Sequence, residues 1–253
     1  MSTPTTTRSG ERGRAERGAG ASARPRRVPW LLDVYQSALG KKYAMALTGL
    51  VLMLYVLVHM IGNLKLYLGA SQLNHYSEWL REVGAPALPH TGLLWIVRLA
   101  LIVSFAVHIH AAYSLTRMNR RARPERYRSR RDYIAADFAG RTMRWTGVIV
   151  GLFVIFHLLD LTWGYANPDF VRGDVYHNVV ASFQRWPVAL FYVLANVALG
   201  YHLYHGGWSL FQSMGWNNPR FKHWRRYFAV AFAALVVLGN ISFPVAVVTG
   251  LVG

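Results

Sequence analysis

The stretch YAMALTGLVLMLYVLVHMIGNL, residues 43–64, decides the fold class of this chain. It contains 22 residues and no charged side chain. A helix of that length reaches about 33 Å, which is enough to cross a hydrocarbon core of about 30 Å. One ionisable residue, His59, lies inside the stretch. Because a polar group in hydrocarbon is costly, we expect His59 to face protein, a cofactor or a cavity.

The spacing around this histidine occurs a second time in the chain. A Thr-Gly pair at residues 48–49 precedes His59 with nine residues between them, and a Thr-Gly pair at residues 146–147 precedes His157 in the same way. The two histidines lie 98 positions apart, in two apolar segments. Two membrane helices with a histidine at matched depth predict a cofactor held between them.

The composition is typical of a polytopic membrane protein. Of 253 residues, 53% are hydrophobic and 15% are charged. The chain has no cysteine, which excludes disulfides and any metal site built from its own thiolates. A net charge of +17 would suit a nucleic-acid partner, but the basic residues cluster in loops beside apolar segments. We therefore expect a lipid bilayer as a partner and no nucleic acid.

Four more apolar segments follow, at about residues 92–115, 145–163, 188–210 and 228–252. The Lys plus Arg counts are 9, 2, 10, 2 and 4 in residues 1–42, 65–91, 116–144, 164–187 and 211–227. This alternation follows the positive-inside rule. We expect an all-α, polytopic bundle of five transmembrane helices in the cell inner (cytoplasmic) membrane. The N-terminus and the second and fourth loops are predicted to be cytoplasmic, and the C-terminus to be outside.

The chain divides into two parts. Residues 1–30 are mostly Arg, Ser, Thr, Gly and Ala, which predicts a disordered basic cytoplasmic tail, and residues 31–253 form the five-helix domain. Each outer loop has apolar residues at helical spacing, at residues 71–83 and 174–184. We expect both segments to form short amphipathic helices on the outer surface. Their likeness indicates that the first two and the next two transmembrane helices are related units.

Counting along the predicted helices places six histidines at two depths. His59 and His157, the outer pair, lie toward the outside. The inner set lies about 8–12 Å from the inner face and consists of His108, His110, His202 and His205. Imidazole is the usual axial ligand of haem iron, and two imidazoles on facing helices at one depth suit a bis-histidine haem. The alternative for each histidine is a hydrogen-bonded packing residue.

Two other ionisable residues lie inside predicted spans. Arg98 could neutralise a haem propionate. Asp160, one turn after His157, could orient that histidine or exchange quinone protons. The alternative is that Arg98 and Asp160 pair with each other or reach the outer interface.

Several motifs resemble those of a known family. They are GKKYAMALTG, HMIGNLKLYLG, the Asn-His-Tyr of residues 74–76, RLALIVSFAVHIHAA, NRRARPERY and YHLYHGGWSLFQSMG. Over roughly residues 35–252 the chain resembles the cytochrome b558-type membrane-anchor subunit of succinate dehydrogenase/fumarate reductase, respiratory complex II. The resemblance implies five transmembrane helices and no catalytic centre for succinate in this chain. It also implies a flavoprotein and an iron–sulfur subunit as partners, and electron transport to quinone through two b haems.

The resemblance also implies ligands. The outer pair matches the outer haem ligands, and His205 matches the inner ligand of the fourth helix. For the second helix the resemblance favours His108, whereas the internal repeat of HAAYSL and HGGWSL favours His110. Residues two apart point about 200° apart on a helix, so only one of them can face the ligand. We prefer His108, and we keep His202 as the alternate to His205.

The inner histidines also suit a different metal centre. A Rieske-type [2Fe–2S] cluster needs two histidines and two cysteines. Since this chain has no cysteine, the iron–sulfur partner would have to supply the thiolates.

The predicted function is electron relay: a partner oxidises succinate, and this chain passes the electrons to menaquinone or ubiquinone. An inner quinone site is predicted from Trp30, Ser37 and Lys41, because Ser and Lys can hydrogen-bond a quinone carbonyl. The alternative for Lys41 is a marker of the inner interface. A second possible quinone site lies on the outer side, near Asn63, Lys65, Glu78 and Glu82.

Two other functions fit the same pattern. One is a b-type cytochrome subunit of another dehydrogenase, such as formate dehydrogenase or hydrogenase. The other is a cofactor-free transporter that uses histidine and aspartate inside the membrane.

Overall fold

The computed structural model describes residues 29–122, 134–216, 218 and 222–253. Residues 1–28 of the predicted basic tail lie outside the described residues, and so do residues 123–133 of the second predicted cytoplasmic loop. Throughout the described ranges the regular elements are all helices, which confirms the all-α prediction.

Within the described part of the chain, five helices are long and apolar enough to cross a membrane, which agrees with the predicted five spans. They are α2 (Ala38–Asn63), α4 (Gly92–Ala122), α5 (Ile134–His157), α7 (Trp186–Ser213) and α8 (Lys222–Val248). Large apolar side chains remain exposed along these helices, as expected of surfaces that face lipid. The chain is therefore built as a multi-pass membrane protein.

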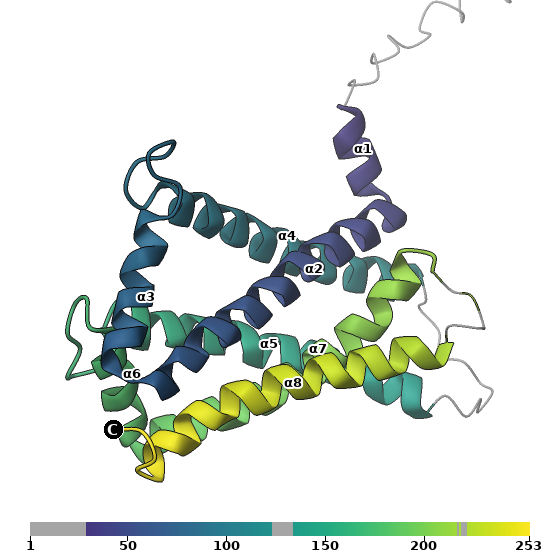
Figure 1. Ribbon diagram of the computed structural model, residues 1–253. Helices are drawn as coiled ribbons and strands as arrows, with labels where there is room; N and C mark the ends of the chain where they lie inside the picture. Colours follow the sequence, from purple (N-terminus) through teal and green to yellow (C-terminus); the bar gives the residue numbers. More distant parts are fainter. Residues whose placement is uncertain (1–28, 123–133, 217, 219–221) are drawn as a thin grey trace, which may run out of the picture.

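The remaining elements are short. They are α1 (Trp30–Gln36), the 3₁₀ turn η1 (Leu64–Leu68), α3 (Ala70–Glu82), the π-helical turn η2 (Leu158–Thr162) and α6 (Val175–Gln184). Helices α3 and α6 match the two short helices that the sequence predicts. In Figure 1, α3, α6 and the C-terminus lie at one end of the bundle, and α1 lies at the opposite end. We call these the α3–α6 end and the α1 end.

The junction between α1 and α2 is built from the residues that sequence analysis assigned to a quinone site. Ser37 caps α2, because its Oγ accepts a hydrogen bond from Gly40 N at 2.9 Å. Lys41 Nζ donates to the carbonyls of Tyr35 and Gln36, each at 3.0 Å, and so satisfies carbonyls at the end of α1. A Cβ at Gly40 would lie 1.9 Å from a backbone oxygen of α1, so the turn requires glycine here.

A side-chain clamp joins the two short helices at the α3–α6 end. Asn74 on α3 donates to Asp174 Oδ1 at 2.8 Å and accepts from the backbone nitrogen of Tyr176 at 3.0 Å. Asp174 caps α6 by accepting from His177 N at 3.0 Å. The hydrogen bonds from His177 N and from Asn74 hold the pKa of the Asp174 carboxyl below its ordinary value.

The core lies where α2, α7 and α8 meet. One buried cluster fills the middle of the bundle and contains Met53, Leu199, Leu203, Ala233 and Val236. A second cluster fills the α3–α6 end and includes Met60, Leu66, Leu73, Phe183, Tyr192 and Phe243. Helix α2 also packs against α4, and α5 packs against α7. These two helix pairs carry the six histidines.

Candidate functional site

Two of the inner histidines face each other across the bundle. The rings of His108 on α4 and His202 on α7 have centroids 6.4 Å apart and planes inclined at 67°. His205, the ligand preferred from sequence, is not the partner of His108. Its ring lies 5.0 Å from that of Tyr204, and its Nε2 lies 3.5 Å from Thr142 Oγ1. The structure therefore pairs His108 with the alternate, His202.

The orientation of His108 is fixed by the first turns of α2. Its Nδ1 lies 3.1 Å from the Met45 carbonyl oxygen and 3.4 Å from Thr48 Oγ1. The Thr48 hydroxyl donates to Ala44 O at 2.7 Å, so its oxygen is an acceptor toward the histidine. Since a carbonyl oxygen can only accept, Nδ1 of His108 carries the proton.

His202 is contacted by α5 at the corresponding threonine. Its Nδ1 lies 3.5 Å from Thr146 Oγ1. The Thr146 hydroxyl donates to Thr142 O at 2.8 Å. Met143 and Thr146 occupy positions 98 residues after the Met and Thr that hold His108. The predicted relation between the two helix pairs is thus accompanied by an equivalent Thr–His contact in each pair.

The glycines of the two Thr-Gly pairs make room for the inner histidines. A Cβ at Gly49 would lie 3.2 Å from Cε1 of His108, and a Cβ at Gly147 would lie 3.4 Å from Cε1 of His202. In the sequence, the Thr-Gly spacing indicated a role for the histidine farther along the same helix. The structure shows that each Thr-Gly pair contacts a histidine of the neighbouring helix instead.

This arrangement leaves each inner imidazole with a defined reactive atom. In a neutral imidazole with Nδ1–H, the other nitrogen, Nε2, holds the lone pair that binds a metal. A hydrogen bond from the distal ring nitrogen to a carbonyl is a common way to orient a metal-binding histidine. His108 has this bond, and Thr146 lies beside His202 as Thr48 lies beside His108.

The outer pair forms a second site. The rings of His59 on α2 and His157 on α5 have centroids 5.9 Å apart and nearly perpendicular planes, at 89°. Each lies ten residues beyond the glycine that contacts an inner histidine. Ten residues of helix correspond to about 15 Å, so the two pairs lie at two levels of the bundle.

Both pairs fit the dimensions of an iron bound by two imidazoles. Two metal–nitrogen bonds of about 2 Å each, extended to the ring centres, separate the centroids by about 6 Å. Across residues 29–122, 134–216, 218 and 222–253, no three His, Asp or Glu side chains gather in a group that could hold a metal ion. The donors come in pairs, and haem iron requires only two axial ligands from protein.

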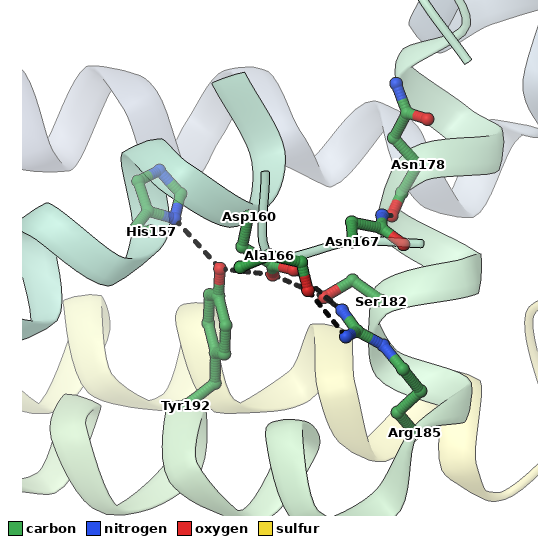
Figure 2. Close-up of polar contacts among 8 residues, drawn as sticks. All are labelled: His157, Asp160, Ala166, Asn167, Asn178, Ser182, Arg185 and Tyr192. Carbon is green, nitrogen blue, oxygen red and sulfur yellow. Dashed lines mark hydrogen bonds and ion pairs between the residues drawn. The ribbon is translucent and has the colours of Figure 1, made fainter. Parts of the chain in front are cut away.

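Asp160 lies in a polar network at the outer level. It is fully buried. Its Oδ1 accepts from Arg185 Nη2 at 2.7 Å, and its Oδ2 accepts from the hydroxyls of Ser182 and Tyr192. The same Tyr192 hydroxyl lies 3.4 Å from Nδ1 of His157 (Figure 2).

Asp160 pairs with Arg185, so the alternative in which Arg98 and Asp160 pair with each other is not the arrangement in the structure. The Arg98 guanidinium lies over the Trp95 ring, 5.1 Å from its centroid. Arg185 was not among the predicted site residues because it lies outside the predicted spans. Arg185 lies between α6 and α7 and caps both helices. The chain folds back here, which brings the Arg185 side chain to Asp160. The only signal for it in the sequence was an aspartate inside a span, which required a cationic partner.

His110 faces the α1 end instead of the bundle interior. Its Nδ1 lies 2.6 Å from the hydroxyl of Tyr35 on α1, and the two rings are stacked at 5.8 Å. Residues two apart on α4 therefore serve different purposes. His108 faces His202, whereas His110 docks α1.

The quinone candidates fall into two places. At the α1 end, Trp30 is 71% exposed, while Ser37 and Lys41 make the helix-junction contacts described above. At the α3–α6 end, Lys65 lies over the Tyr76 ring at 5.3 Å. A pocket of about 320 Å³ opens there, lined by Lys65, Gln72, His75, Tyr76 and Trp79. Glu78, another candidate of the outer site, forms an ion pair with Arg81.

A family model described as the succinate dehydrogenase/fumarate reductase transmembrane subunit matches residues 116–241. The matched region runs from the end of α4 to within α8 and contains His157, Asp160 and His202. Comparisons with curated proteins and with solved structures returned no match. The match agrees with the family that the sequence motifs resemble. It adds to the two structural observations already described, the five spans and the paired histidines. This chain belongs to the succinate dehydrogenase/fumarate reductase transmembrane subunit family.

Proposed function

We propose that this chain is the membrane-anchor subunit of a succinate dehydrogenase, a succinate:quinone oxidoreductase. In this role it relays electrons from an iron–sulfur subunit to membrane quinone. The observation that carries the proposal is the pair of histidine pairs, at two levels of a five-helix bundle, in a member of this family. Succinate oxidation belongs to a flavoprotein partner, and this chain supplies the path across the membrane.

The residues that would hold two b haems are His59 with His157, and His108 with His202. Haem iron held between two imidazoles accepts and donates single electrons. The protein's own contribution is to orient the imidazoles. The Met45 carbonyl accepts a hydrogen bond from Nδ1–H of His108, and Thr146 on α5 lies against Nδ1 of His202. Each Nε2 is thereby kept unprotonated, and His205 and His110 are assigned to packing and to docking of α1.

The α1 end is proposed to face the cytoplasm and to bind the flavoprotein and iron–sulfur subunits. By sequence, the segments richest in Lys and Arg are residues 1–42 and 116–144. Of their described parts, α1 lies at this end, and the last turns of α4 follow His110, which contacts Tyr35 of α1. Positive loops remain on the cytoplasmic side of a bacterial-type inner membrane. Electrons would then enter at the level of His108 and His202 and reach the level of His59 and His157 second.

The quinone site is proposed at the α1 end, next to the exposed Trp30. The Ser37 hydroxyl and the Lys41 ammonium already form hydrogen bonds that hold the α1–α2 junction. They could bind quinone only with these same groups. The pocket beside Lys65 is a second candidate, favoured by its volume of about 320 Å³ and its aromatic lining. Replacing Trp30 or Lys65 by Ala and measuring succinate:quinone reductase activity separates the two. Loss of activity in one variant only identifies the site.

The experiment that tests the proposed function is a reduced-minus-oxidised visible spectrum of the purified complex, with iron and acid-labile sulfide analysis. We expect two b-type haems, one of which is lost in His59→Ala or His157→Ala. Full haem content in both variants would make the outer pair a packing feature.

The same preparation tests the alternatives. Iron and sulfide without the inner haem would favour a shared Rieske-type cluster with cysteines from the partner. Copurification of formate dehydrogenase or hydrogenase subunits would favour another dehydrogenase. A colourless protein without metal would favour a transporter.

A further inference from the structure

The outer level contains a charged network that the electron-relay proposal does not use. Asp160 is a completely buried carboxylate next to hydrocarbon. Burying a charge is costly unless it is paired and hydrogen-bonded. Arg185 supplies the opposite charge at 2.7 Å, and the hydroxyls of Ser182 and Tyr192 supply two further hydrogen bonds. The carboxylate is thereby held in one position.

The network is anchored in several elements at once. Asp160 lies in the π-helical turn η2, one turn after His157, and Ser182 lies on α6. Arg185 Nη1 also donates to the carbonyl of Ala166, in the loop after η2, at 2.7 Å. This second hydrogen bond fixes the orientation of the guanidinium. Replacing a buried ion pair by apolar residues is often neutral for stability, so stability alone does not account for a network of this kind.

Tyr192 connects the network to the outer pair. Its side chain is almost fully buried, and its ring packs between Phe153 and Phe183 at centroid distances of 5.1 and 4.9 Å. Its hydroxyl lies 2.9 Å from Asp160 Oδ2 and 3.4 Å from His157 Nδ1, as Figure 2 shows.

The direction of these hydrogen bonds follows from the chemistry of the groups. A carboxylate can only accept, so the Tyr192 hydroxyl donates its single proton to Asp160. The tyrosine oxygen is then an acceptor toward His157, whose Nδ1 carries the proton. The result is a relay from the imidazole N–H through the tyrosine hydroxyl to a buried carboxylate. At the inner level, His108 donates instead to a neutral carbonyl.

We propose that Tyr192, held by the Asp160–Arg185 ion pair, is a positioning residue for His157 and sets the redox potential of the outer centre. The inference rests on the proposed function, because it requires a haem at the outer pair. The relay fixes the tautomer and ring orientation of His157 and leaves Nε2 as the ligand atom. A carboxylate at the end of the relay makes the imidazole a more electron-rich ligand, which stabilises the oxidised iron and lowers the potential of the outer centre.

The test is the variant Tyr192→Phe in the complete complex, followed by redox titration of each haem. The matched control is Tyr201→Phe on the same helix, a tyrosine that is 56% exposed. We expect both haems to remain in Tyr192→Phe, with the potential of the outer haem raised and that of the inner haem unchanged. The ferric electron paramagnetic resonance signal of the outer haem should shift as well, because the His157 ring loses its restraint. An outer haem with the potential and signal of the control overturns the inference.

A second variant uses different atoms in case Tyr192→Phe fails to assemble. Asp160→Asn combined with Arg185→Gln removes both charges and keeps hydrogen-bonding groups. The outer potential should again rise, since the relay ends on a neutral group, and an unchanged potential overturns the inference. These results are distinct from failure of the proposed function, which would show as a missing outer haem in the unmodified complex.

Discussion

His108 and His202 each meet a Thr hydroxyl of the preceding long helix, although they lie on different helices and are 94 positions apart. Each also lies against the Gly that follows this Thr, and the Thr-Gly positions repeat with an offset of 98. The two helix pairs therefore present their inner histidines to each other in equivalent surroundings. This relationship indicates His202, and not His205, as the inner partner of His108.

Replacing His202 by Ala should remove the inner b-type absorption, whereas replacing His205 by Ala should leave it. His202 faces His108 at 6.4 Å, while His205 contacts Tyr204. Reduced-minus-oxidised spectra of the two purified variants provide the comparison. Succinate oxidation with an artificial acceptor should persist in both. If only His205→Ala loses the absorption, our assignment of the inner pair is wrong.

A side chain at Gly49 should displace the inner imidazole. The built Cβ already lies 3.2 Å from Cε1 of His108, so Gly49→Val forces the ring to move. We expect the affinity for the inner haem to fall about 10-fold, as is common when the support of a metal ligand is disturbed. Gly151→Val is the control, because a Cβ at Gly151 meets nothing within 4 Å. Equal haem contents in the two variants would contradict this packing role.

Removing one member of the Asp160–Arg185 pair should destabilise the fold strongly. Arg185→Met leaves a buried carboxylate without its cation, which costs about 3–5 kcal/mol for such pairs. The double variant Asp160→Asn, Arg185→Met should lose less, since no unpaired charge remains. Denaturant or thermal unfolding in detergent, arranged as a double-mutant cycle, measures the coupling. Additive losses would show that the two residues act independently.

The clamp between α3 and α6 should weaken at low pH. The pKa of Asp174 is held below its ordinary value of 3.8, so the native state binds fewer protons than the unfolded state there. The stabilisation is complete above the ordinary value and is lost as the pH falls through the lowered pKa. Asp174→Asn keeps an N-cap residue but does not titrate. The protection of the α6 amides from hydrogen exchange, relative to the intrinsic rate at each pH, should fall below about pH 3.8 in the unmodified chain and stay level in the variant.

The membrane orientation is open to a direct test. The alternation of basic residues predicts that the α1 end is cytoplasmic and that the C-terminus, at the α3–α6 end, is outside. A reporter that is active only outside the cytoplasm, fused after Val252, should therefore be active. A reporter fused at the N-terminus serves as the opposite control. Activity of a strictly cytoplasmic reporter after Val252 would refute this orientation.

Much of the fold was determined by the sequence itself. Predominantly apolar stretches of about 18 or more residues form helices in lipid because every backbone group must be satisfied within the segment. Residues 43–64 and the four later segments therefore predicted the five spans, and local amphipathic spacing predicted α3 and α6. The matched positions of His59 and His157 also predicted that these two rings face each other, since equal depth on related helices is a property of spacing.

Only the tertiary structure decided which polar groups meet. Helical spacing fixes depth and face, but it does not fix how far one helix is turned or shifted against its neighbour. His202 and His205 are one turn apart, so a small shift of α7 determines which of them faces His108. The contacts between α7 and α5 place His202 there. Asp160 pairs with Arg185 instead of Arg98 because the chain folds back through α6. Local sequence patterns do not predict such a long-range fold-back. The same path carries the buried charge to Tyr192 and, through its hydroxyl, to His157.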